Sequence, residues 1–281
     1  MFIFFFNVLK SFTMAATNNE DLKKGFITDV TDYSKCMIDI YKEINCLLAS
    51  PNRFMPISDR EEKSVFDIEL IKKVSKGKYT TRWRGISMMK DTFDLTIYEQ
   101  LLWEIKPKTI FETGTYTGAC ALWMADVMKM YDLPVQIYSI DISLDLVDPQ
   151  IKTCKNISIK KIDVKKINQV FSGEFLKTCP HPWIISEDCH VDVIGVMEHF
   201  HHYMCKGDYF VIEDTSPETP LTSGQGLLQQ QYEQWGTRKL TLMKDFLKKY
   251  NEFYRVDTFY TDYFGYNGTF NWDGYIRRIK D

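Results

Sequence analysis

Apolar and polar residues follow two different periods along this chain, and the order of those periods predicts its elements. Short apolar runs at 109–112, 135–140, 157–162, 183–186 and 209–212 have the length and composition of β-strands. Apolar residues recur every three or four positions, the period of a helix, at 94–105, 121–131 and 193–204. Strands and helices therefore alternate. This order predicts an α/β fold with a mostly parallel central sheet and helices on both faces.

The N-terminal third carries weaker patterns. Residues 33–48 have one apolar stripe at helical spacing, so we expect an amphipathic helix that packs on something, and a second helix is expected near 66–74. The segment TTRWRGISMM at 80–89 has no regular period. It is either an arm that folds over the ligand end of the sheet or a surface connector. Asp94 is expected to cap the helix that follows.

The C-terminal part is predicted to close the fold. A Gly- and Gln-rich stretch at 221–237 suggests a flap or a surface loop, and Thr237 is expected to cap a last helix. The aromatic, β-rich segment 253–279 is interrupted at Asn267-Gly268, which favours a closing antiparallel hairpin.

These patterns divide the chain into three parts. We expect a mobile extension at 1–31, a helical segment and arm at 32–92, and the main domain at 93–281. The first residues, MFIFFFNVLK, are too few to span a bilayer and lack the basic start and the cleavage site of a signal peptide. We favour an extension or alternative start before Met14, and a weak membrane anchor stays open.

Composition narrows the class of protein. With 281 residues, of which 44% are hydrophobic, the chain can bury a full core, so disorder is excluded. A net charge of −3 with mixed signs gives no electrostatic footprint for nucleic acid or for an anionic membrane. The seven cysteines are scattered and form no CxxC pair, which favours a reducing compartment and a cytoplasmic protein without disulfides. A homo-oligomer stays open.

The stretch TIFETGTYTGAC at 109–120 predicts a ligand cradle. A strand ending in Glu112 is followed by glycines at Gly114 and Gly118 before a helix begins. Glycine allows a positive φ and a close backbone approach to a ligand, and the helix N-terminus points free N–H groups at the same place. Thr115 and Tyr116 complete the turn. An ordinary strand–helix turn without a ligand is the alternative.

Two further acids extend this predicted nucleotide site. Asp141 ends the second strand, where a βαβ unit places a carboxylate on ribose hydroxyls. Asp163 ends the third strand and would either face an adenine or cap a helix. Tyr116 stands where a dinucleotide fingerprint has its middle glycine. A site without a pyrophosphate tolerates the larger residue, which favours S-adenosylmethionine over NAD.

Carboxylates also follow the next two strands. These acids, which would meet at one edge of a parallel sheet, are Glu187, Asp188, Glu213 and Asp214. Unpaired like charges repel, so the cluster predicts a hard cation such as Mg²⁺, which could hold an acceptor hydroxyl and lower its pKa. His190 lies beside the cluster and could take the hydroxyl proton. Solvated helix caps and strand ends are the alternative reading.

His199 and His202 share a helix face, yet no further ligand is spaced to match them. We therefore reject a zinc site there and expect a polar helix surface.

Several segments together resemble a known family. They are RGI, DLTIYEQLLWEIKPKTIFETGTYTGA, YSIDIS, SEDCH, KGDYFVIEDTSP and, more weakly, DGYIRR. From about Trp83 onward the chain resembles the cephalosporin hydroxylase and rhamnosyl O-methyltransferase family, a branch of the class I S-adenosylmethionine-dependent methyltransferases. The resemblance implies a Rossmann-like class I methyltransferase fold.

The resemblance also implies a set of ligand-binding residues. The cofactor would be held by Glu112, Gly114, Gly118 and Asp141. Mg²⁺ would be held by Glu213, Asp214 and either Glu187 or Asp188. Metal-dependent catechol methyltransferases carry a lysine just after that acid, and Val191 stands here. The identity of the general base therefore stays open.

The sequence thus predicts a metal-assisted, S-adenosylmethionine-dependent O-methyltransferase. Its expected acceptor is a small hydroxylated molecule, such as a sugar, a phenol or a secondary metabolite. An NAD-binding oxidoreductase and a non-catalytic Rossmann-like binding module are the alternatives.

Overall fold

The computed structural model describes residues 30–216 and 227–281. The chain divides into two units, residues 1–50 and 51–281. Helix α3 (Val30–Leu48) is the described part of the first unit and confirms the helix expected at 33–48. The rest of the extension expected at 1–31 lies outside the described residues. Five apolar side chains on α3 are exposed: Tyr33, Met37, Ile40, Tyr41 and Ile44.

An eight-stranded sheet organises the second unit, in the order β1-β9-β10-β8-β7-β4-β5-β6. The strands β4 to β8 pair in parallel, whereas β10 runs antiparallel to both of its neighbours. The strands are β1 (Phe54–Met55), β4 (Thr109–Thr113), β5 (Gln136–Asp141), β6 (Ile157–Lys161), β7 (Trp183–Glu187), β8 (Tyr209–Ile212), β9 (Tyr254–Asp257) and β10 (Tyr275–Arg278). The predicted, mostly parallel sheet is confirmed.

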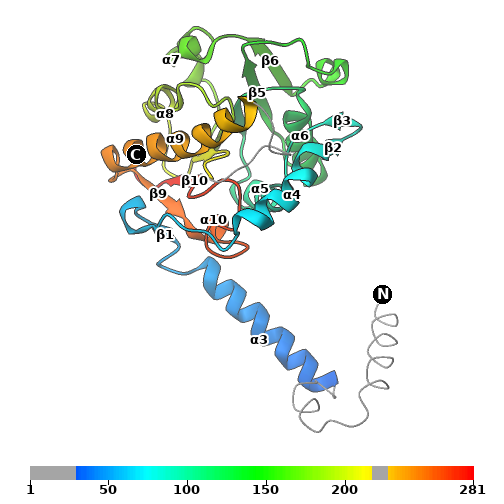
Figure 1. The fold of residues 1–281 in the computed structure, drawn as a ribbon, viewed down its shortest axis with the longest axis vertical. Coiled ribbons are helices and arrows are strands. Elements are labelled where there is room, and N and C mark those ends of the chain that lie inside the picture. The colour runs from blue at the N-terminus through cyan, green and yellow to red at the C-terminus, as the bar shows by residue number, and fades with distance from the viewer. Residues whose placement is uncertain (1–29, 217–226) are drawn as a thin grey trace. The chain divides into compact units, whose positions relative to one another are not determined.

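Helices cover both faces of this sheet, with α5 and α6 on one side and α8 and α9 on the other (Figure 1). The helices are α4 (Ile68–Thr80), α5 (Thr92–Ile105), α6 (Ala119–Met130), α7 (Gly173–Leu176), α8 (Val193–His201), α9 (Leu227–Lys249) and α10 (Thr258–Thr261). Short 3₁₀ turns are η1 (Ile57–Asp59), η2 (Pro149–Thr153) and η3 (Val164–Gln169).

The strands contribute to two separate hydrophobic cores because successive side chains of a strand point to opposite faces of the sheet. In β4, Phe111 packs in the core on the α8 and α9 side, whereas Ile110 packs in the core with α5 and α6. In β7, Ile185 and Ile184 divide in the same way. Both faces are therefore buried, as the near-continuous apolar runs require.

Residues 51–92 belong to the same compact unit as the sheet. Strand β1 pairs with β9 at the sheet edge. The buried Arg60 forms ion pairs with Asp262, at 2.7 Å, and with Asp273, at 2.6 Å. These contacts fix the segment before the central strands to the C-terminal end.

The segment at 80–89 forms a hairpin of β2 (Arg82–Trp83) and β3 (Ile86–Ser87). The indole N–H of Trp83 donates to Asp126 of α6 at 2.7 Å. Asp91, not Asp94, caps α5, because the Asp91 carboxylate accepts from the backbone N–H of Asp94. Asp94 lies inside the first turn and is buried.

The C-terminal expectations are met in part. Strands β9 and β10 pair antiparallel as predicted, but α10 and a loop join them, and Asn267 is buried rather than at the tip of a hairpin. Helix α9 begins at Leu227, ten residues before the expected cap at Thr237, so the part of the predicted flap at 227–237 is helical. The rest of that flap, at 221–226, lies outside the described residues.

All seven cysteines lie in the part of the chain that the structure describes, and each is a free thiol, as expected. Among the described helices, none combines the length and the apolar character that crossing a bilayer requires.

Candidate functional site

A cavity of about 430 Å³ lies where the parallel strands end. It is lined by residues that follow β4, β5, β6, β7 and β8, together with Met88, Met89 and Lys90 from the segment before α5. The segment after the β2–β3 hairpin thus does reach the ligand end of the sheet. The predicted site residues that line this cavity are Gly114, Thr115, Tyr116, Asp141, Asp163, Asp188, His190 and Asp214.

The glycine turn has the geometry that its sequence predicted. Gly114 has a φ of +100°, and a Cβ placed there would lie 2.6 Å from the carbonyl oxygen of Asp188. Only glycine fits this position without displacing the backbone after β7. Gly118, with a φ of +81°, is the N-cap of α6. The turn therefore brings the start of α6 and the end of β4 to the same cavity wall.

Asp141 is held at the cavity by two backbone N–H groups. The N–H of Tyr116 donates to its Oδ2 at 2.9 Å, and the N–H of Ser143 donates to its Oδ1 at 3.2 Å. These bonds fix the carboxylate at the end of β5. Asp163 caps η3, as one of its two readings expected, by accepting from the N–H of Lys165, and it also lines the cavity.

Glu112 does not line the cavity, although the sequence placed it among the cofactor ligands. Its side chain is buried beneath the turn and accepts a hydrogen bond from the Ser139 hydroxyl, which also contacts Thr115 Oγ1 at 2.6 Å. Burial raises the pKa of Glu112 to about 7, against the effect of the Ser139 hydrogen bond. Through Ser139, Glu112 thus stabilises the glycine turn that follows β4.

The four acids after β7 and β8 are divided between the two faces of the sheet. Glu187, the last residue of β7, is fully buried and pairs with Lys239 of α9 at 2.7 Å. Its neighbour Ser186 points to the opposite face and donates to Glu213 at 2.7 Å. Glu187 is therefore a buried structural partner of α9. Of the two open choices, Asp188 is the acid that lines the cavity.

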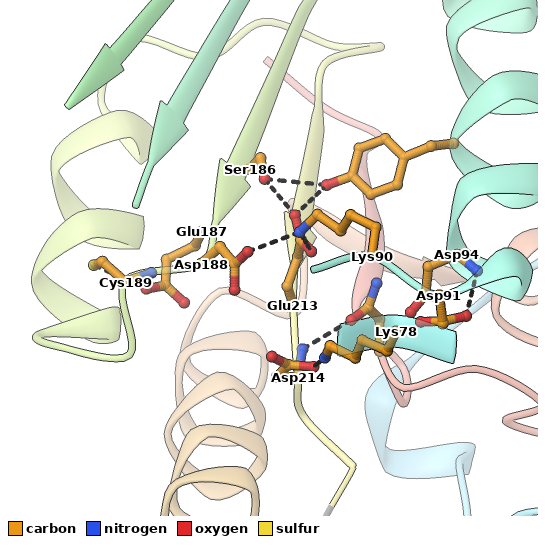
Figure 2. Close-up of polar contacts among 12 residues, drawn as sticks. Lys78, Lys90, Asp91, Asp94, Ser186, Glu187, Asp188, Cys189, Glu213 and Asp214 are labelled. Carbon is orange, nitrogen blue, oxygen red and sulfur yellow. Dashed lines mark hydrogen bonds and ion pairs between the residues drawn. The ribbon is translucent and has the colours of Figure 1, made fainter. Parts of the chain in front are cut away.

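Asp188, His190 and Asp214 converge at this wall. One ligand atom from each lies within 4.8 Å of the others. His190 Nε2 is 3.6 Å from Asp188 Oδ1 and 3.8 Å from Asp214 Oδ2. The second oxygen of each aspartate contacts a lysine: Lys90 Nζ lies 2.7 Å from Asp188 Oδ2, and Lys78 Nζ contacts Asp214 Oδ1 (Figure 2).

Glu213 is held apart from this trio. Lys90 pairs with its Oε2 (Figure 2). The hydroxyl of Tyr98 donates to its Oε1 at 2.7 Å. Burial and the charge of Asp188 raise the pKa of Glu213, whereas Lys90 overcomes burial and lowers the pKa of Asp188. Burial opposes the charge on Lys90, yet Asp188 and Glu213 raise its pKa well above the usual value.

These lysines correct one premise of the sequence prediction. The carboxylates are not left to repel one another, because Lys78, Lys90 and Lys239 pair with all four of them. The lysines lie 52 to 136 positions from their partners. Sequence reasoning missed them, and the one available signal was a lysine directly before the cap of α5.

The cavity has the volume that a small-molecule cofactor needs and some of the ligand atoms that a Mg²⁺ ion needs. About 430 Å³ is within the usual range for small-molecule sites, roughly 300 to 1,000 Å³. A cation at this wall would meet two carboxylates, from Asp188 and Asp214, and the imidazole of His190. The carboxylate oxygens are ligands that suit Mg²⁺. Glu213 could join them only if Lys90 released it. The Nε2 atom of His199, by contrast, contacts the carbonyl oxygen of Phe171 at 2.7 Å.

Comparison with known proteins identifies relatives of this chain. The model of the Rhamnosyl O-methyltransferase/CmcI family matches residues 75–279. A rhamnosyl O-methyltransferase of Mycobacterium leprae (strain TN) is 26% identical over 145 residues, which are 49% of this chain and 61% of the relative. The rhamnosyl O-methyltransferase of Mycobacterium tuberculosis (strain ATCC 25618 / H37Rv) is 22% identical, over 48% of this chain and 57% of the relative.

Solved structures agree with these matches. A structure of CmcI with Mg-SAM is 27% identical, with a TM-score of 0.58, over 72% of this chain and 77% of that one. A structure of CmcI with SAH is 25% identical, with a TM-score of 0.55, over 71% and 82% of the two chains. The chain spans only 57% to 61% of the length of the curated relatives named above.

Proposed function

Because the chain belongs to the Rhamnosyl O-methyltransferase/CmcI family, we propose that it is an S-adenosylmethionine-dependent O-methyltransferase. The observation that carries the proposal is the cavity at the strand ends, where the Gly114 turn, the Asp141 carboxylate and the start of α6 meet. The CmcI structures with Mg-SAM and with SAH support this assignment. The comparisons give no support to an NAD-binding oxidoreductase or to a non-catalytic binding module.

The cofactor would bind along the turn. Asp141, oriented by two backbone N–H groups, is positioned to accept hydrogen bonds from ribose hydroxyls. Asp163, which lines the same cavity, would face the adenine. Gly114 lets the turn pack directly against the backbone of Asp188, which forms another part of the cavity wall. When bound, S-adenosylmethionine supplies an electrophilic methyl group, and the residues around it hold that group toward the acceptor.

The acceptor hydroxyl would lie beside Asp188, Asp214 and His190. A bound Mg²⁺ supplies a positive charge that orients a hydroxyl and lowers its pKa. Asp188 and Asp214 would hold the ion, and Glu213 lies within reach once Lys90 moves. His190 lies between the two aspartates, and it could receive the proton of the hydroxyl at Nε2 only if Lys239, whose ammonium group contacts Nδ1 at 3.3 Å, released that nitrogen.

A sugar hydroxyl is the acceptor that the relatives favour among the small hydroxylated molecules considered. The curated relatives are rhamnosyl O-methyltransferases. Sugar hydroxyls are weak acids, so a cation that lowers their pKa and a base that takes their proton would both assist methylation. Asp188, Asp214 and His190 provide a place for each.

Radiolabelled S-adenosylmethionine and a panel of rhamnosides, other glycosides and phenols test the proposal. Methyl transfer is measured with Mg²⁺ and with EDTA. We expect transfer to at least one glycoside with Mg²⁺ and a large loss in EDTA. Cofactor binding without transfer to any hydroxyl in the panel would contradict the proposed activity. Equal transfer in EDTA would contradict only the role of the metal.

A further inference from the structure

A second cluster of ligand-type side chains lies at the other end of the parallel strands. His181 precedes β7, and Cys205 and Asp208 precede β8. None of the three lines the cavity at the strand ends. The cluster is therefore separated from the proposed methyl-transfer site by the length of the strands. The proposed function does not use it.

Asp208 fixes the orientation of the His181 ring. The carboxylate is 1% exposed and is itself held by the backbone N–H of Trp183, at 2.8 Å, and that of Cys205, at 2.6 Å. Its Oδ2 lies 2.8 Å from His181 Nδ1. Because a carboxylate only accepts, Nδ1 carries the proton and Nε2 has a lone pair available. The ring also stacks on Trp183, with centroids 4.1 Å apart.

This orientation points the ring at a thiol. His181 Nε2 lies 3.5 Å from Cys205 Sγ. Two ligands of a tetrahedral zinc ion, with bonds of about 2.3 Å to sulfur and 2.0 Å to nitrogen, are separated by roughly 3.5 Å. The two atoms are thus already at the spacing that one ion requires. A carboxylate on the far nitrogen of a histidine is the usual outer partner of such a ligand.

We propose that Cys205 and His181 bind one zinc-like, borderline-soft divalent ion, with Asp208 orienting the histidine. Cys205 is exposed and His181 is half-buried, so an ion and its remaining water ligands can reach the pair from solvent. The carboxylate of Asp281, which accepts from the N–H of Lys206 at 2.6 Å, adds negative charge nearby. The ion joins the loop before β7 to the loop before β8.

The same three residue types could instead form a nucleophilic Cys–His–Asp triad, and the surroundings argue against it. Partial burial, with the charges of Asp208 and Asp281, raises the pKa of the Cys205 thiol. A nucleophilic cysteine needs the opposite shift, because the thiolate is the reactive form. Negative charge that disfavours a free thiolate favours a bound cation.

The test is a titration of the full chain with Co²⁺ and with Zn²⁺, in excess Mg²⁺ to occupy the carboxylates of the cavity. Cobalt bound by a thiolate gives a charge-transfer absorption band, and zinc binding is followed by calorimetry. The variants are Cys205→Ser and His181→Gln. The matched control is Cys46→Ser, because Cys46 is also an exposed free cysteine.

We expect one tightly bound ion and a charge-transfer band in the wild type and in the control. Cys205→Ser should lose the band, and each site variant should weaken zinc binding by at least about tenfold. Zinc should also protect Cys205 of the wild type from alkylation, measured on its peptide by mass spectrometry. This readout does not depend on the folding of a variant. An unprotected Cys205, or zinc binding equal in wild type and Cys205→Ser, would overturn the proposal.

Discussion

Lys90 is expected to act as a built-in counter-ion whose loss both weakens the fold and improves metal binding. Its ammonium group is buried between two carboxylates, 2.7 Å from Asp188 Oδ2 and in contact with Glu213 Oε2. Lys90→Met removes this charge and retains most of the side-chain volume. Breaking a buried ion pair by removing one partner costs about 3 to 5 kcal/mol. In a domain of this size, that corresponds to a fall in Tm of roughly 6 to 20 °C.

Mg²⁺ should reverse part of this loss. Without Lys90, Asp188 and Glu213 have no protein cation between them, so a divalent ion no longer competes with an ammonium group. A tenfold gain in Mg²⁺ affinity adds about 1.4 kcal/mol of stability at saturating metal, or roughly 3 to 6 °C in Tm. The metal should therefore raise the Tm of Lys90→Met more than that of the wild type.

Thermal unfolding in EDTA and in a Mg²⁺ series measures both effects. The control is Lys280→Met, because Lys280 lies 3.2 Å from a carboxylate oxygen of Glu252 and the two side chains are 59% and 71% exposed. A surface pair of this kind contributes about 0 to 1 kcal/mol. The reasoning is refuted if Lys90→Met melts in EDTA at the wild-type temperature, or if Mg²⁺ shifts both proteins equally.

Three further changes give separate tests. Burial raises the pKa of Glu112 from 4.5 to about 7, so the folded protein should lose stability as pH rises from 4.5 to 7, by roughly 3 kcal/mol in total. Urea unfolding at several pH values should show this fall in the free energy of unfolding, and Glu112→Gln should make it smaller. Gly114→Ala should destabilise the protein more than Gly207→Ala, because both positions have positive φ but only the first Cβ would meet a neighbour, and equal melting temperatures would contradict this. His190→Ala should slow methyl transfer by about 10² to 10⁴ without weakening cofactor binding, whereas near-normal turnover at all pH values would remove His190 from the mechanism.

The fold could be predicted because its signals are local. Apolar runs of strand length, helical spacing and the glycines near β4 each depend on a few neighbouring residues, and the structure confirms all five parallel strands. The predicted start of the last helix was wrong because the glycines near it, such as Gly236, disfavour a helix and were given too much weight. The leucines and glutamines at 227–234 favour a helix, and the backbone is helical from Leu227. The prediction of a hairpin tip at Asn267-Gly268 was wrong because hydrogen bonds with the backbone of Lys63 and Asp273 hold the Asn267 side chain inside the protein.

Of the candidate site, the sequence could predict only the residues at the carboxyl ends of the parallel strands. Parallel strands end together, so acids such as Asp141, Asp188 and Asp214 could be grouped from sequence. The choice between Glu187 and Asp188 depends on which face each side chain takes at the end of β7. Partners from α4 and α9, such as Lys78 and Lys239, were missed because tertiary folding brings them to the acids.

Calorimetric titration of S-adenosylhomocysteine into the wild-type chain and into Asp141→Asn tests the central claim most directly. Asp141 is held by two backbone N–H groups at the cavity wall, and loss of its charge should cost roughly 1.5 to 3 kcal/mol of binding, about tenfold to a hundredfold in affinity. We predict one site per chain, unchanged by EDTA and weakened by this factor in the variant, with no comparable binding of NAD. Equal affinity in the two proteins, or tight binding of NAD, would contradict the claim that this cavity is an S-adenosylmethionine site.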